Sequence, residues 1–122
     1  MSVPPAVNLA EKLALFSDHW NPRIVGRYND NEVRVSKLKG EFVWHSHAET
    51  DELFLVLKGR LTIEFRDGVR TLGPGEFLVV SKGVEHRPVA PEEVELLIMD
   101  REGEPNTGDA ISEHTRAGLE AL

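Results

Sequence analysis

The sequence predicts an all-β fold in which the sheet closes on itself or packs against a second sheet. Short apolar or alternating segments follow one another between residues 23 and 100, and turn residues bound each of them, which is typical of antiparallel strands. Two histidine-containing segments, 42–47 and 81–88, lie far apart in the chain. For their imidazoles to meet in one site, the sheet must be closed or sandwiched.

Within a single domain we expect three regions: an N-terminal arm with a short helix (residues 1–22), a barrel (23–100) and a polar C-terminal tail (101–122). Asn8 is a favourable N-cap and Glu11 stands three residues after it, which predicts a helix over 8–16 that packs outside the barrel or on a partner. His19 lies in the following loop with no second ligand nearby, so we expect a surface or packing residue.

Two hairpins are predicted from turn residues between alternating segments. Residues 29–31 (Asn-Asp-Asn) join segments 23–28 and 32–38, and Asp67-Gly68 joins 61–66 to 69–72. Further on, we expect a buried strand at 76–80 and two closing strands, at 89–90 and 94–99, around the turn at 91–93. In the tail we expect a loop at 105–109, then a frayed helix or disorder over 112–122 with His114 in solvent.

The segment from Trp44 to Glu52 carries two imidazoles and three carboxylates. His45 and His47 leave the same face of a strand, so they can converge on one ion. Glu52 can face them once the polar residues before it turn the chain. Glu49 and Asp51 are rival carboxylates, but Glu52 is favoured because it begins a buried strand.

His86, from the second histidine segment, adds a third imidazole. Three neutral imidazoles and one carboxylate suit Fe, Mn, Co, Ni or Zn. The chain has no cysteine, so histidines and carboxylates are its only strong metal ligands. We therefore predict one site for a divalent metal ion.

Aromatic and apolar side chains near this segment predict a second subunit. If His45 and His47 point into the barrel, Phe42 and Trp44 point out. Segment 52–58 is apolar on both faces, so both faces should be buried. We expect a homodimer that covers these residues by sheet-on-sheet contact.

These motifs resemble those of the cupin family, which are small β-barrels of the jelly-roll type. The first family motif is matched by Gly40, His45, His47, Glu52 and Gly59, and the second by Gly75, segment 81–83 and His86. Ser81 and Ala90 stand where the family has proline and asparagine. The resemblance implies an all-β, cupin-type jelly-roll barrel, and it implies a metal ion held by His45, His47, Glu52 and His86.

Composition limits the functions to be considered. A chain of 122 residues with 40% hydrophobic and 29% charged residues is typical of one globular domain. A formal net charge of -7 repels phosphate backbones, so we expect no nucleic-acid partner. We find neither a signal peptide nor a bilayer-spanning apolar stretch, and we expect a cytoplasmic protein without a membrane partner.

Together, the motifs and the resemblance imply a metal-dependent enzyme acting on a small polar metabolite, such as a sugar derivative or organic acid, by isomerase, lyase or dioxygenase chemistry. Two alternatives stay open: a binding or sensing module without turnover, and a metal-free structural cupin. No catalytic residue is identified; Glu41 and Glu49 are candidate general bases, and Arg87 is expected to be a surface charge. The residues predicted to line the barrel, including Phe54, Val56, Ile63 and Phe65, are mostly apolar, which indicates a small pocket with few polar anchors.

Overall fold

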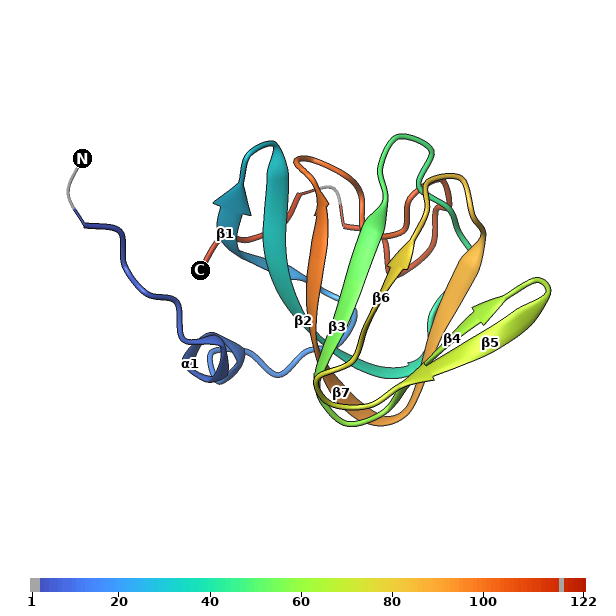
Figure 1. Ribbon diagram of the computed structural model, residues 1–122, viewed down its shortest axis with the longest axis horizontal. Coiled ribbons are helices and arrows are strands. Elements are labelled where there is room, and N and C mark those ends of the chain that lie inside the picture. The colour runs from blue at the N-terminus through green and yellow to red at the C-terminus, as the bar shows by residue number, and fades with distance from the viewer. Residues whose placement is uncertain (1–2, 117) are drawn as a thin grey trace.

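The computed structural model describes residues 3–116 and 118–122, and these form a curved antiparallel sheet rolled into an open jelly roll (Figure 1). The all-β jelly roll with a short N-terminal helix is therefore confirmed. Seven strands form the sheet, with the order β1-β2-β7-β3-β6 and a β4–β5 hairpin attached to β7. Their bounds are β1 Arg23–Tyr28, β2 Asn31–Glu41, β3 Glu52–Lys58, β4 Leu61–Phe65, β5 Gly68–Leu72, β6 Phe77–Val80 and β7 His86–Arg101.

The longest strand, β7, connects the two parts of the sheet. It pairs with β4 through its first residues and with β2 and β3 further along. The two closing strands expected around the turn at 91–93 are therefore one continuous strand of 16 residues. The register with β2 shifts between Leu38 and Gly40, opposite Pro91. Because the ladder is interrupted there, the missing N–H of Pro91 breaks no pairing, and the strand bends instead of ending.

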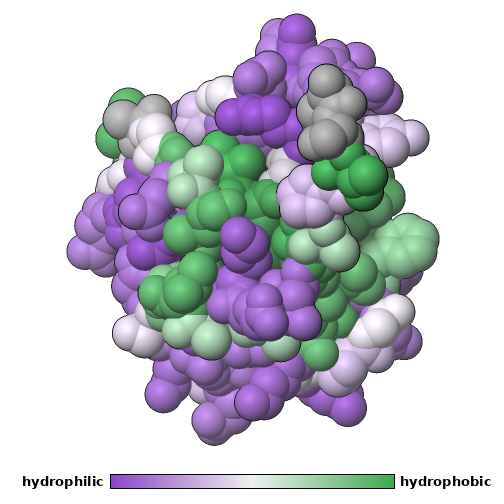
Figure 2. All heavy atoms as spheres, turned by 90° about the vertical axis from the view of Figure 1, so that its left-hand side faces the viewer, coloured by the Kyte–Doolittle hydropathy of each residue, from purple (hydrophilic) through white to green (hydrophobic). Residues whose placement is uncertain are grey.

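The N-terminal helix, α1 (Leu9–Leu13), packs on the outside of the sheet as predicted. The Asn8 side chain caps it by accepting a hydrogen bond from the Glu11 amide at 3.0 Å, although the helix ends before residue 16. Leu13 packs with Val25 and Val35 from the outer face of β1 and β2. Figure 2 shows hydrophobic residues gathered on this side of the molecule and surrounded by hydrophilic ones. No helix in the described ranges is long and apolar enough to span a membrane.

The interior of the jelly roll holds the main core, and Phe42 belongs to it. Phe42 is 8% exposed, and its ring stacks on Trp20 with centroids 4.6 Å apart. The outward position predicted for Phe42 is wrong, because β2 ends at Glu41 and the alternation of a strand does not continue past it. Trp44 does lie outside this core, where the guanidinium groups of Arg66 and Arg87 cover its ring at 3.9 and 5.6 Å.

The outer face of β3 and β6 is less buried than the sequence suggested. Along β3, Phe54 and Val56 are buried, whereas Leu53, Leu55 and Leu57 are partly buried. On β6, Phe77 and Val79 are 63% and 49% exposed, so the buried strand predicted at 76–80 is buried on one face only. An apolar surface therefore remains on this side of the sheet.

The C-terminal tail returns to the barrel, and its described residues contain no helix. Turns occupy the loop predicted at 105–109. Further on, the Ile24 amide donates to the Glu120 carbonyl and the Leu122 amide donates to the Ile24 carbonyl, each at 2.9 Å. Figure 1 shows the segment, in red, crossing the jelly roll and ending beside β1. Over 112–116 and 118–122 the described residues therefore show neither of the expected alternatives, a frayed helix or disorder; residue 117 lies outside the described residues.

His114 also differs from its expected solvated position. Its ring centroid lies 5.9 Å from that of Trp20 and 5.4 Å from that of Phe42. Asn106 fixes this arrangement, because its side chain donates to the carbonyls of Trp20 and His114 and accepts from the Arg116 amide. The tail thereby covers one end of the core.

Candidate metal centre

Four buried side chains, those of His45, His47, Glu52 and His86, meet inside the jelly roll, and one potential ligand atom from each lies within 4.8 Å of the others. Glu52 and His86 are the first residues of β3 and β7. His45 joins β7 through a short antiparallel bridge in which its amide donates to the His86 carbonyl and the His86 amide donates back, at 3.1 and 2.9 Å. The structure thus brings together all four residues predicted from the sequence.

The other candidates lie elsewhere. Glu49 is exposed, and Asp51 accepts a hydrogen bond from the Lys82 amide at 2.9 Å, away from the cluster. His19 pairs with Glu93 at 2.7 Å on the surface, as expected. Glu41 is exposed and pairs with Arg87 at 2.9 Å.

Each of the three imidazoles has its Nδ1 held by a group that can only accept a hydrogen bond. The acceptors are the backbone carbonyls of Val43 for His45 (2.9 Å) and of Val84 for His86 (2.9 Å), and the Glu104 carboxylate for His47 (2.8 Å). Nδ1 therefore carries the proton in each neutral ring, and Nε2 has the free lone pair. The cluster offers three nitrogen lone pairs and one carboxylate.

This donor set fits a divalent metal ion. The Nε2 atoms of His47 and His86 lie 3.3 and 3.2 Å from Oε1 of Glu52, so lone pairs face a carboxylate oxygen. Nε2 of His47 is buried and has no hydrogen-bond partner among the residues that the structure describes. A cation among these atoms would satisfy them together, and three imidazoles with one carboxylate is a set typical of Fe, Mn, Co, Ni or Zn.

Burial and the neighbouring charges set the protonation of the cluster. Burial lowers the pKa of His45 to about 4, so this ring is neutral at neutral pH and can act as a ligand. Burial also acts to lower the pKa of His47, but the Glu52 and Glu104 carboxylates outweigh it and raise that pKa. For Glu52, burial acts to raise the pKa, and the neighbouring His47 and His86 imidazoles outweigh it, so the pKa is held well below its usual range.

A buried ionic network lies behind Glu52. Arg34 is 1% exposed; its guanidinium donates to the Glu32 carboxylate at 2.7 and 3.0 Å and to the Asp100 carboxylate at 3.2 Å. Burial and the charge of Glu52 raise the pKa of Asp100 well above its usual range. Sequence reasoning missed this network because it did not assign the polar face of β2 to the interior. Leu38 lies on the same face of the strand as Arg34 and Ser36, and this apolar neighbour was the available sign that the face points inward.

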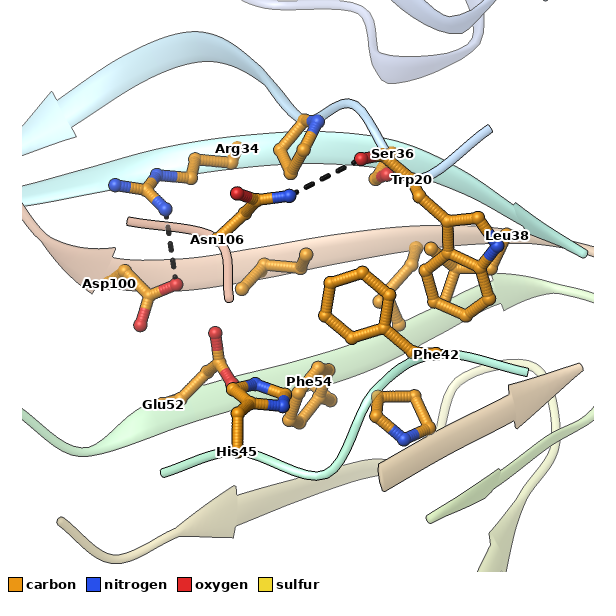
Figure 3. A pocket seen from close by; sticks show the side chains of 14 residues that line it. Trp20, Arg34, Ser36, Leu38, Phe42, His45, Glu52, Phe54, Asp100 and Asn106 are labelled. Atoms are coloured by element: carbon orange, nitrogen blue, oxygen red, sulfur yellow. Dashed lines mark hydrogen bonds and ion pairs between the residues drawn. The ribbon is translucent and has the colours of Figure 1, made fainter. Parts of the chain in front are cut away.

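A cavity opens beside the cluster, between the sheet and Phe42 (Figure 3). Trp20, Leu38 and Phe42 form an apolar end, while Arg34 and Asp100 lie at the other end. Its empty volume is about 390 Å³ including solvent at the mouth, so it suits a small ligand.

The residues predicted to line the barrel, Phe54, Val56, Ile63 and Phe65, do belong to the interior core or pack against it, and of these Phe54 also lines the cavity. Val56, Ile63 and Phe65 do not line the cavity; Val56 and Ile63 are fully buried in the core, and Phe65 packs against it.

Comparisons with known proteins agree with this geometry. Residues 32–100 match the family model described as "Cupin domain". The chain is 39% identical over 83 residues to the uncharacterized protein YdbB of Bacillus subtilis (strain 168), covering 67% of each chain. A cupin-2 domain containing protein from Shewanella frigidimarina NCIMB 400 is 47% identical, with a TM-score of 0.77 over 78% of this chain and 93% of that one. Protein NMB1881 from Neisseria meningitidis is 31% identical, with a TM-score of 0.73 over 80% and 99%.

Proposed function

This chain belongs to the cupin family, and from that premise we propose that it is a metal-dependent enzyme acting on a small organic acid. His45, His47, Glu52 and His86 would hold the ion. The observation that carries the proposal is the buried four-residue cluster, two members of which, His45 and Glu52, line a cavity. A divalent metal bound there supplies Lewis-acid or redox chemistry to a ligand coordinated beside it.

The cavity walls favour an organic acid over an intact sugar. Hydroxyl groups surround a sugar ring, and each needs a polar partner once it is buried. Here the walls near Trp20, Phe42 and Phe54 are apolar and would hold a short carbon skeleton away from water. An organic acid concentrates its oxygen atoms at one end, where the cluster would bind them.

Two unpartnered groups near the cluster support a further polar contact with the ligand. Within the described part of the chain, the Ser36 hydroxyl and Oδ1 of Asp100 are buried without hydrogen-bond partners, and both residues line the cavity. Because the pKa of Asp100 is raised, its carboxyl group can donate a proton to a hydrogen bond. These residues would orient a hydroxyl or carbonyl group of the substrate.

A non-catalytic binding or sensing role is the alternative. It is favoured by the positions of Glu41 and Glu49, which are exposed and do not line the cavity, so neither candidate general base faces a bound ligand. Ligand binding without product formation would distinguish this role from catalysis.

We also propose that the chain forms a homodimer through the outer face of β3 and β6. The exposed side chains of Phe77 and Val79, beside the partly buried Leu53 and Leu55, support this proposal. Light scattering coupled to size exclusion would test it, and a mass of 13.7 kDa at micromolar concentration would contradict it.

The proposed activity is tested in two steps. Metal content is first measured by plasma mass spectrometry on untagged protein purified without chelator, together with the His47→Ala variant. We expect near-stoichiometric metal in the wild type and its loss in the variant. Protein reconstituted with Fe, Mn, Co, Ni or Zn is then assayed with short organic acids, and we expect turnover that disappears when the metal is stripped. A wild type that takes up none of these metals would overturn the proposal.

A further inference from the structure

We infer that the C-terminal tail is part of the metal centre, with Glu104 as a positioning residue for His47 and Asp109 as the residue that fixes the ligand segment. Both residues follow the matched domain, which ends at residue 100. This inference rests on the proposed metal site, because it concerns how strongly that site binds its ion.

The hydrogen-bond acceptor at Nδ1 of His47, Glu104, differs in kind from the acceptors of the other two imidazoles. His45 and His86 each donate Nδ1–H to a neutral backbone carbonyl two residues earlier in the chain. His47 instead donates to a carboxylate 57 positions away, at 2.8 Å. A carboxylate that accepts from one imidazole nitrogen fixes the ring orientation and makes the other nitrogen a stronger ligand. Glu104 therefore acts on the nitrogen that has no hydrogen-bond partner.

The position of Glu104 is itself fixed by the barrel. Its backbone carbonyl accepts a hydrogen bond from the buried Arg34 guanidinium at 3.0 Å, and its amide donates to the Arg101 carbonyl at 3.0 Å. The Glu104 side chain is only 15% exposed. The carboxylate is thus held against His47 by β2 and by the turn after β7.

Asp109 holds the backbone between two of the ligands. Its carboxylate accepts from the Ser46 amide at 2.7 Å and contacts the Ser46 hydroxyl at 3.2 Å, and its own amide donates to the Ser46 carbonyl at 2.9 Å. Ser46 is the residue between His45 and His47. Residues 42–47 belong to none of the seven strands, so these contacts help to fix where both imidazoles point.

Gly108 permits this close approach. A Cβ atom at Gly108 would lie 2.1 Å from the Ser46 carbonyl oxygen and 3.2 Å from Nδ1 of His47. Its φ of +55° is also a conformation that side chains disfavour. A larger residue would therefore push the tail away from the ligand segment.

The first test changes the charge of Glu104 while keeping its shape. We expect Glu104→Gln to weaken Co²⁺ and Zn²⁺ binding by about 10- to 100-fold, measured by competition with a chromophoric chelator. The melting temperature of the metal-free protein should change little, and the visible spectrum of bound Co²⁺ should shift. Glu102→Gln is the matched control, because this exposed carboxylate lies in the same turn and pairs only with Arg27 among the described residues.

The second test uses a substitution at Gly108 to push the tail away from the ligand segment. Gly108→Ala should weaken metal binding at least as much as Glu104→Gln. Gly118→Ala, in the same tail, should leave it unchanged, because a Cβ added there has open space among the described residues. Wild-type affinity in Glu104→Gln or Gly108→Ala would overturn the inference, as would equal losses in Glu102→Gln. A wild type that binds neither ion would instead refute the proposed metal site.

Discussion

Replacing Arg34 with methionine should destabilise the protein strongly, because it leaves buried carboxyl groups without their partner. Arg34 is 1% exposed and donates to Glu32, to Asp100 and to the Glu104 carbonyl. Asp100 can stay protonated, so in the variant this residue loses only one hydrogen bond. Glu32 is also buried and would keep only the half-exposed Arg27 at 3.1 Å. Breaking a buried ion pair on one side costs about 3–5 kcal/mol, and we expect Arg34→Met to fall in that range.

The measurement is urea unfolding of the metal-free protein, with the free energy of unfolding and the m-value fitted together. Arg70→Met is the control; Arg70 is exposed and has no ion pair among the described residues, so we expect a change within about 0.5 kcal/mol. Removing the uncompensated charge with Glu32→Gln in the Arg34→Met background should restore more than half of the loss. A loss below about 1 kcal/mol in Arg34→Met, or no recovery in the double variant, would refute this account of the network.

Three further predictions concern the cavity, the cluster and the outer sheet. Ser36→Ala should stabilise the metal-free protein by about 1 kcal/mol in the same assay, because it removes a buried hydroxyl without a partner; a loss of stability would mean that the hydroxyl is satisfied. The His45 imidazole should titrate in NMR spectra of metal-free protein near pH 4, since burial disfavours its charged form, and a midpoint near 6.5 would contradict that reasoning. Phe77→Asp should give a monomer in light scattering if the outer face of β6 forms the proposed dimer, whereas a dimer that persists would place the contact elsewhere.

Local signals in the sequence predicted much of the fold. The hairpins at 29–31 and 67–68 and the cap at Asn8 depend on residues that are neighbours in the chain, and the structure has all of them. The grouping of the four candidate ligands also followed from spacing within one segment and from the motif around His86. The hairpins, the cap and the closeness of His45 to His47 could be predicted because each is determined by a short stretch of residues, whereas His86 was added through its own motif.

The errors came from irregular backbone and from contacts distant in sequence. Phe42 was placed outside because strand alternation was extended past Glu41, where β2 ends. The role of the tail was missed because Asn106 and Glu104 act on residues at the other end of the chain or in its middle, and no local pattern indicates such partners. The polar composition of residues 101–122 is typical of a solvated terminus. Only the structure shows that some of these polar groups form buried hydrogen bonds.

The arrangement of β7 has a consequence for how the protein is made. This strand is the shared neighbour of β2, β3 and β4, yet it begins at His86, after all three have been synthesised. Earlier hairpins can form on the ribosome, but the two parts of the sheet have no common partner until β7 emerges, and such non-local pairing is slow. His86 is also the residue that completes the candidate ligand set. A nascent chain therefore cannot present all four ligands before β7 begins, so a complete metal site requires at least the start of the strand that joins the two parts of the sheet.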